Sequence, residues 1–286
     1  MKALHFIADL YAEDMMPPGG GELNNDEFIN ICSQEFGIKV HKHRSYEIRE
    51  KGIEFLRDNK GDKFVIANFL GITPEIIEFI TENLNYAIYE HDHKYLSTRD
   101  PTPFLNFMAP KEELRNTKFY ENAIAVLCQS KKHSEILKSN LPKCKVINLS
   151  GNLWSLETLD LLRKLSSVEK DNKLVVMNSL NPIKNTNVNR AYCEKKGVEY
   201  KLVGPLPYHD FLKTVASHKS LVFFPGVFET LCRVAIECRM MNVGVVTNTN
   251  LGATSESWFK LKGENLIDYM IEKRKEIPSK ILGAIS

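Results

Sequence analysis

Short apolar runs of four to six residues alternate with longer amphipathic stretches along the whole chain. The runs are rich in β-branched and aromatic residues, and the stretches between them repeat their apolar positions with a helical period. This alternation is typical of βα units, in which helices cover parallel sheets. The sequence therefore predicts an α/β protein with strands at Ala3–Ile7, Ile38–His41, Phe64–Phe69, Tyr86–Tyr89, Ile124–Cys128, Val146–Leu149, Leu174–Met177, Tyr200–Val203, Leu221–Phe224 and Val243–Thr247.

The polar stretch Ser166–Asn172 follows a leucine-rich helix and precedes a new strand, which places a domain boundary near residues 150–172. We expect two doubly wound domains, 1–155 and 156–286, whose strands end at a shared cleft. Function is expected in that cleft. The predicted helices are Glu22–Phe36, Pro74–Asn83, Lys131–Asn140, Lys184–Lys196, Tyr208–Ser217, Glu229–Met241 and a closing helix, Leu266–Leu282, that packs back on the body.

Composition excludes several classes of protein. The 286 residues are 43% apolar and 26% charged with a net charge of +2, which excludes a disordered chain, collagen and a strongly basic nucleic-acid coat. Residues 1–150 carry 19 basic and 22 acidic side chains, and residues 151–286 carry 19 and 14, so an anionic ligand would prefer the second half.

The chain shows no targeting or oxidative signature. No apolar run approaches the roughly 20 residues of a membrane span, and Asp9 interrupts the first apolar run too early for a signal peptide. We therefore expect a cytoplasmic protein without a membrane span. The six cysteines form no C-x-x-C pair, so we expect reduced thiols and neither a disulfide frame nor a zinc site.

A glycine-rich turn follows the first predicted strand. In Pro17-Pro18-Gly19-Gly20-Gly21-Glu22, three glycines allow a ligand to approach the backbone, and free amides at the next helix start favour a phosphate. The turn is neither G-x-G-x-x-G nor a Walker loop. A flexible surface turn explains it equally well.

The most informative segment is Phe223–Glu237. We expect a buried strand to end at Pro225-Gly226 and a helix to begin near Glu229. Glu229 and Glu237 are eight residues apart, so they would share one helix face, and Thr230, Leu231 and Cys232 would expose free amides. Two carboxylates on an apolar face indicate a ligand site. The alternative is that Glu229 caps the helix and Glu237 pairs with Arg233.

These residues resemble retaining glycosyltransferases of the GT-B fold, family 4 and its relatives. The resemblance covers about three-quarters of the chain in the family's motif order. In the first half, Gly19–Glu22 is similar to the family's glycine loop, and Glu90–Asp92 is similar to its catalytic histidine region. In the second half, the similar segments are Val175 to Lys184, Gly204–Pro207, Pro225 with Glu229 and Glu237, Gly244–Thr247, and Gly252 to Glu256.

The resemblance implies two Rossmann-like domains facing across a cleft, with 1–155 on the acceptor side and 156–286 binding the nucleotide sugar. The implied reaction moves a sugar from a nucleotide-diphosphate sugar, with a UDP-sugar favoured, to an acceptor hydroxyl with retention of configuration. The resemblance leaves the acceptor unidentified, with a glycan, a small molecule and a hydroxylated DNA base as candidates, and it leaves the oligomeric state open. No permanently bound cofactor and no metal is implied, and the sequence has no Asp-x-Asp triplet.

The resemblance also assigns residue roles. His91 and Asp92 would lie near the reacting centre, Glu229 would bind sugar hydroxyls, and Glu237 would bind the ribose. Gly20, Gly21, Lys184 and the amides of Thr230, Leu231 and Cys232 would bind the diphosphate. Asn178-Ser179 stands where the family has an arginine, and Arg190 and Arg233 are the candidates to replace it.

Alternatives to these assignments stay open. Glu90–Pro101 fits an active-site loop, a polar surface loop, or a metal site at His91-x-His93 with His41-x-His43 as a second pair. Lys111–Lys145 holds eight basic and four acidic residues, which suits either a solvated helix face or contact with DNA. Some compact bacteriophage GT-B enzymes that modify DNA have a His-Asp pair similar to His91-Asp92.

Two rival functions stay open. One is a non-catalytic module that binds a nucleotide or a glycan. The other is an NAD-dependent oxidoreductase, which is disfavoured because the sequence lacks G-x-G-x-x-G after its first strand.

Overall fold

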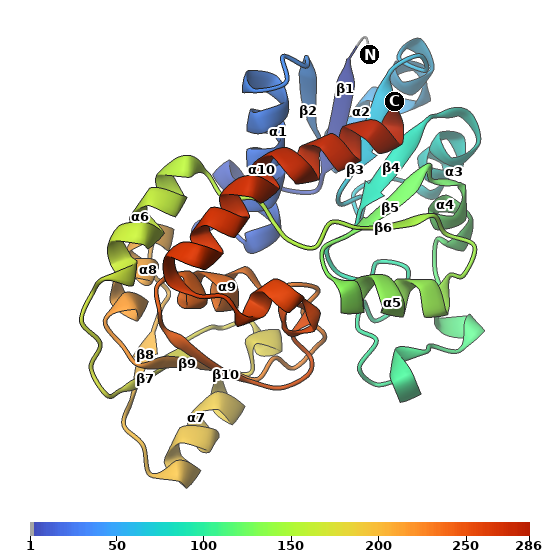
Figure 1. The fold of residues 1–286 in the computed structure, drawn as a ribbon. Coiled ribbons are helices and arrows are strands. Elements are labelled where there is room, and N and C mark those ends of the chain that lie inside the picture. The colour runs from blue at the N-terminus through green and yellow to red at the C-terminus, as the bar shows by residue number, and fades with distance from the viewer. Residues whose placement is uncertain (1–2) are drawn as a thin grey trace.

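The structure, a computed structural model, describes residues 3–286 and contains two parallel β-sheets (Figure 1). The first sheet has the order β2-β1-β3-β4-β5-β6, and the second has the order β10-β9-β7-β8. The predicted α/β class with two doubly wound sheets is confirmed. The strands are β1 Leu4–Ala8, β2 Val40–Arg44, β3 Lys63–Ile66, β4 Tyr86–Tyr89, β5 Ala125–Cys128, β6 Val146–Asn148, β7 Leu174–Met177, β8 Tyr200–Val203, β9 Ser220–Phe223 and β10 Gly244–Thr247.

Helices cover both faces of each sheet, as apolar residues on both faces require. In the first, or N-terminal, lobe α1 and α10 cover one face, and α2 to α5 pack on the other. In the second, or C-terminal, lobe α6, α8, α9 and α10 cover one face, and α7 covers the other. The helices are α1 Gly20–Gln34, α2 Ser45–Asp58, α3 Pro74–Asn83, α4 Thr117–Asn122, α5 Lys131–Asn140, α6 Leu156–Ser166, α7 Thr186–Lys196, α8 Tyr208–Ala216, α9 Arg233–Met240 and α10 Gly263–Ile285.

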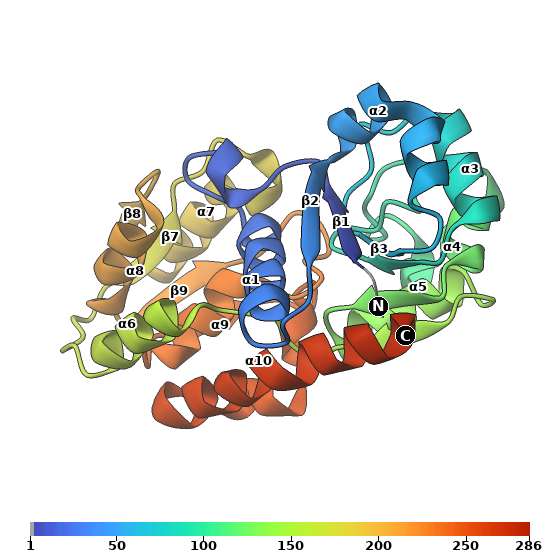
Figure 2. The same ribbon diagram turned by 90° about the horizontal axis from the view of Figure 1, so that it is seen from above.

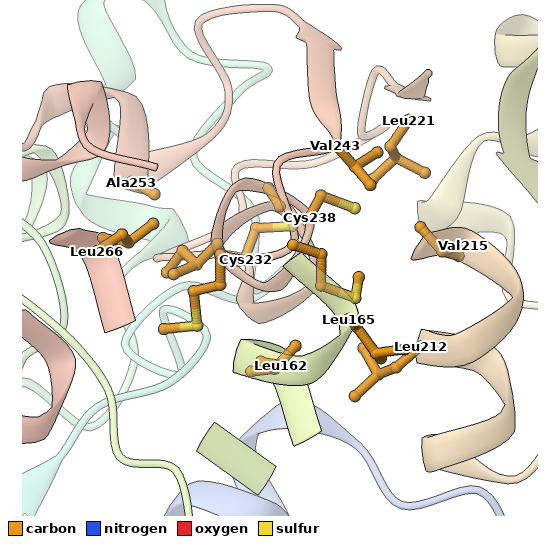
Figure 3. Close-up of a cluster of buried hydrophobic side chains, with 14 of the residues drawn as sticks. Leu162, Leu165, Leu212, Val215, Leu221, Cys232, Cys238, Val243, Ala253 and Leu266 are labelled. Carbon is orange, nitrogen blue, oxygen red and sulfur yellow. The ribbon is translucent and has the colours of Figure 1, made fainter. Parts of the chain in front are cut away.

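The core of the C-terminal lobe contains leucine, valine and two cysteines among its buried apolar residues (Figure 3). Cys232 and Cys238 belong to the same cluster as Leu162 and Leu266, and burial of both thiols raises their pKa. All six cysteines are buried and carry free thiols. They therefore behave as small apolar residues.

Two segments connect the lobes. Residues 149–155 lead from β6 of the first sheet to α6 of the second lobe, and Leu149, Leu153 and Trp154 are fully buried there. Helix α10 runs back across both lobes (Figures 1 and 2). Its first part packs in the C-terminal core through Leu266, and its last part packs on the N-terminal sheet through Ile281.

Within residues 3–286, no helix combines the length and apolarity needed to cross a membrane. The positions of the elements define one place where loops from both lobes meet. These are the loops at the carboxyl ends of the strands, with α1 standing between the two lobes (Figure 2).

Candidate functional site

A cleft of about 590 Å³ lies between the lobes. Its N-terminal wall is formed by residues 17–21 before and at the start of α1, together with His91 and Gln129 at the ends of β4 and β5. Its C-terminal wall is formed by residues 177–181, 203–206 and 229–234 after β7, β8 and β9. Of the predicted site residues, Gly20, Gly21, His91, Lys184, Glu229, Thr230, Leu231, Cys232 and Glu237 line it.

Glu229 and Lys184 form an ion pair in the cleft wall. Lys184 Nζ lies 2.6 Å from Glu229 Oε1, and both side chains are partly exposed. Burial alone would lower the pKa of Lys184, but the Glu229 carboxylate outweighs it and raises that pKa above its ordinary value. The lysine is therefore a fixed cation beside an anion, with access to the cleft.

Glu237 lies deeper in the same wall and is 2% exposed. Its Oε1 accepts hydrogen bonds from Trp154 Nε1 at 2.8 Å and from the Tyr208 hydroxyl at 2.5 Å. Arg233 Nε lies 3.1 Å from the same oxygen. The pairing with Arg233 that the sequence offered as an alternative is present, and the carboxylate still lines the cleft.

The helix after β9 begins later than the sequence predicted. Helix α9 starts at Arg233, with Cys232 as its N-cap at φ 74°, so Glu229 neither shares a helix face with Glu237 nor caps the helix. The cause is a parallel bridge: Glu229 N donates to Asn250 O, and Gly252 N donates to Glu229 O. The extended backbone at Glu229 is incompatible with a helix there. Thr230, Leu231 and Cys232 lie in the loop before the helix and still line the cleft.

Two helix N-termini meet at the cleft. Helix α1 begins at Gly20 and Gly21, whose amides have no partner within the helix. A Cβ on Gly20 would lie 3.3 Å from Arg233 Cβ in the first turn of α9, so a side chain here would press on that turn. The positive ends of both helix dipoles therefore favour an anionic group in the cleft.

His91 lines the cleft from the N-terminal lobe, close to Gly21. Its Nε2 lies 2.8 Å from Asn25 Oδ1, and its Nδ1 lies 2.8 Å from Gln129 Nε2. Burial lowers the pKa of His91 to about 3, so the imidazole is neutral at physiological pH. It donates from Nε2 and accepts at Nδ1, which leaves neither nitrogen free for proton transfer.

Asp92 is not brought together with the other predicted residues. It is absent from the cleft lining, and its carboxylate pairs with Lys94 at 2.5 Å and with Arg99. Lys94 also reaches the buried Glu90 at 2.8 Å. Local ion pairs therefore turn Asp92 away from the cleft, and the geometry gives its expected catalytic role no support.

The histidine pairs do not assemble metal sites. Among residues 3–286, no group of three or more histidine, cysteine, aspartate or glutamate side chains is placed to hold a metal ion. His41 and His43 stack instead with His5 on the outer part of the first sheet. His93 is fully buried and contacts Tyr95 and His133.

Of the two candidates for the missing arginine, Arg233 reaches the cleft. It stacks over the Trp154 ring at 4.4 Å and donates to Leu153 O. Arg190 lies on the surface of α7, where it contacts Tyr200. Sequence reasoning missed Trp154, Tyr208 and Gln129, because nothing in their local patterns shows what they contact.

The basic segment 111–145 lies in the N-terminal lobe, and its cationic side chains do not line the cleft. The backbone amides of Lys131 and Lys132, at the start of α5, donate to Glu256 and Ser255 of the other lobe. Glu256 also accepts from Ser150 at 2.5 Å. This part of the segment holds the lobes together.

Of the comparisons with known proteins, the one with solved structures found similar folds. No family model matches the sequence, and no curated protein matches it. Among solved structures, the lipopolysaccharide outer core galactosyltransferase WaaB is similar at 11% identity and TM-score 0.50, covering 99% of this chain and 94% of that one. The Anabaena protein HepE with UDP and glucose matches at 14% identity and TM-score 0.48, covering 100% and 94%; an alpha-glucosyltransferase (AGT) with UDP matches at 11% and 0.48, covering 99% and 92%.

The likeness to WaaB, together with the two parallel sheets, shows that this chain has the GT-B fold. It is a two-lobed α/β protein with a cleft at the carboxyl ends of both sheets. Fold alone does not assign an activity, so the function must be argued from the cleft.

Proposed function

We propose that this protein is a glycosyltransferase that takes a sugar from a nucleotide-diphosphate sugar, with UDP as the favoured nucleotide, and transfers it to an acceptor hydroxyl. One observation carries the proposal. Lys184, Glu229, Glu237 and the N-termini of α1 and α9 converge on one interlobe cleft. Cationic and amide groups there suit a diphosphate, and the two carboxylates suit hydroxyl groups.

In this proposal the donor binds so that its diphosphate meets the positive groups of the cleft and its hydroxyls meet the carboxylates. The diphosphate takes the position near Lys184 and the free amides of Gly20, Gly21 and the first turn of α9. Glu229, released from part of its contact with Lys184, accepts hydroxyls of the transferred sugar. Glu237 accepts hydroxyls of the ribose, and the loop 203–206 borders the base.

The same groups support the chemistry. As the bond between the sugar and the diphosphate breaks, negative charge grows on the leaving phosphate, and Lys184 with the helix dipoles stabilises it. The acceptor oxygen attacks from the face of the leaving group, and the departing phosphate oxygen takes the acceptor proton, so configuration is retained. His91 packs beside the reacting sugar as a neutral group, since both of its nitrogens are engaged.

We leave the acceptor as a hydroxyl on a glycan, a small molecule or a DNA base. Residues 17–21 of the N-terminal lobe line the cleft, and the proposal places the acceptor on this side. Metal independence is part of the proposal, because the positive groups named above neutralise the diphosphate.

The test is calorimetric titration of UDP-, GDP- and ADP-sugars in EDTA, followed by assays of donor hydrolysis and transfer to an acceptor panel. We expect one sugar nucleotide to bind. The Glu229→Gln variant should lose about 10²–10³-fold in turnover while keeping the wild-type unfolding temperature. Glu194→Gln, on the exposed face of α7, is the matched control and should keep full turnover.

Three results would contradict the proposal or a part of it. Binding of NAD without binding of any sugar nucleotide would indicate an oxidoreductase. Binding of a sugar nucleotide without hydrolysis or transfer under any condition would indicate a non-catalytic module. Turnover by Glu229→Gln equal to that of wild type would remove Glu229 from the reaction.

A further inference from the structure

The carboxylate of Glu237 is held asymmetrically. Its three polar partners come from three different parts of the chain. Trp154, from the segment between the lobes, and Tyr208, the first residue of α8, donate hydrogen bonds, and Arg233, the first residue of α9, forms an ion pair. All three meet the same oxygen, Oε1. An oxygen of an ionised carboxylate has about two acceptor positions, so Oε1 has no capacity left.

The other oxygen is available. No residue that the structure describes donates a hydrogen bond to Glu237 Oε2, although Glu237 lines the cleft. Burial raises the pKa of the Tyr208 hydroxyl, which therefore keeps its proton and remains a donor at physiological pH. Oε2 is thus the oxygen that a ligand hydroxyl would meet.

The donors are themselves fixed by the connection between the lobes. Trp154 is fully buried, and Arg233 stacks on its ring at 4.4 Å while donating to Leu153 O. Leu153 N donates to Asn24 Oδ1 of α1 at 3.0 Å. The position of Glu237 is therefore set by contacts that reach the helix on the opposite wall of the cleft.

We propose that Trp154, Tyr208 and Arg233 are positioning residues that hold Glu237 so that Oε2 recognises the ribose hydroxyls, which makes the cleft selective for ribonucleotides. This inference rests on the proposed function. A fixed, buried carboxylate rejects a ligand that lacks the hydroxyls, because its oxygen is then left without a partner. A mobile carboxylate would reorient and discriminate weakly.

The experiment compares the Kd of UDP with that of 2′,3′-dideoxy-UDP by calorimetry. Wild type should bind UDP about 10- to 100-fold more tightly, the ratio expected for hydrogen bonds to a charged acceptor. Tyr208→Phe removes one oxygen atom and should lower this ratio at least threefold, mainly by weakening UDP. Trp154→Phe should lower it in the same direction.

Tyr200→Phe is the matched control. It also removes a tyrosine hydroxyl that donates to a glutamate, since Tyr200 contacts Glu194 Oε1 at 2.9 Å, but this pair lies outside the cleft. The ratio should stay at the wild-type value. Tyr208→Phe keeps the test decisive if Trp154→Phe does not fold, because it changes only one hydroxyl.

The outcomes separate the two claims. An unchanged ratio in a folded Tyr208→Phe variant overturns the inference and leaves the proposed function standing. Equal weakening of both ligands also overturns it, because that result describes a merely structural role. If wild type binds neither UDP nor any sugar nucleotide, the proposed function fails, and the inference fails with it.

Discussion

Two charge-rich segments follow buried parallel strands, one after β4 at residues 90–100 and one after β9 at residues 229–237. The charges of the first are paired inside a lobe, whereas those of the second line the cleft. In the first, Glu90 accepts hydrogen bonds from Lys94, the Tyr120 hydroxyl and two backbone amides. The charge of Glu90 is therefore compensated by groups inside the N-terminal lobe. In the second, Glu229 shares the cleft wall with Lys184, and Glu237 has one oxygen that receives no hydrogen bond from residues 3–286.

The two segments differ in how completely hydrogen-bond donors of the protein satisfy the carboxylate oxygens. Burial by itself raises the pKa of Glu90, but Lys94 and then Tyr120 outweigh it and lower that pKa, so Glu90 is ionised and fully compensated. The partly exposed Lys184–Glu229 pair can exchange partners with a ligand. A cluster of charges marks a binding site when its hydrogen-bonding capacity is left incomplete. The predictions below test that distinction.

The largest effect concerns the two lysines, each paired with a glutamate. Lys94 and Glu90 are fully buried, so Lys94→Met leaves a carboxylate without its counterion and should lower the free energy of unfolding by ~3–5 kcal/mol. Lys184→Met removes a partly exposed ion pair and should cost less than about 1 kcal/mol. Urea denaturation measures both, and equal losses would erase the contrast between the segments.

The pH dependence of the free energy of unfolding should reveal the buried histidine of the first segment, His93. Burial lowers the pKa of His93 to about 4, against about 6.5 in an unfolded chain. Between these values the unfolded state binds more protons, so the contribution of His93 to stability is full above pH 6.5, and about 3 kcal/mol of it is lost as the pH drops through 4. The buried His91 and His133 titrate in the same direction, so His93→Phe should reduce, and not abolish, the fall of the urea midpoint over this interval. A variant that titrates in parallel with wild type would exclude His93 as a source.

A smaller effect should come from the bridge that shapes the second segment. A Cβ on Gly252 would lie 2.1 Å from Thr230 O, so Gly252→Ala must displace the backbone of the cleft loop. We expect a loss of about 1–3 kcal/mol in unfolding free energy, with weaker donor binding. Gly283→Ala, in open space on α10, is the control and should gain about 0.5–1 kcal/mol. If Gly252→Ala binds the donor as wild type does, the bridge between Glu229 and Leu251 is not needed for the binding site.

The smallest effect should be on ligand affinity. Lys184→Met removes the cation nearest to the proposed diphosphate and should weaken binding of the sugar nucleotide about tenfold, the size of one charge-assisted hydrogen bond. Lys201→Met, on the exposed part of β8 and outside the cleft lining, should leave the Kd unchanged. A Lys184→Met variant with wild-type affinity would mean that the diphosphate binds elsewhere.

Much of the fold was predictable from the sequence. Apolar runs gave β4 at Tyr86–Tyr89 and β7 at Leu174–Met177, and Pro74 marked the start of α3. Burial on both sheet faces produces such a pattern directly. Helix α2, Ser45–Asp58, was missed because it is rich in charged residues and broken at Gly52, which has φ 68°.

The site was predictable only in part. Glu229, Glu237 and Lys184 reach one cleft, as the motifs implied, but the start of α9 depends on a bridge to Leu251 that local propensity does not encode. Asp92 lies outside the cleft lining because Lys94 and Arg99 pair with its carboxylate, and the spacing of these residues does not show those pairs. Trp154 gave no signal, because its partner Glu237 is distant in the chain.

The most direct measurement of the central claim is a crystal structure of the protein grown with UDP. Electron density for the diphosphate should lie beside Lys184 and the amides of Gly20 and Gly21, with the ribose hydroxyls on Glu237. Density for UDP on any other surface, with the interlobe cleft empty, would contradict the account.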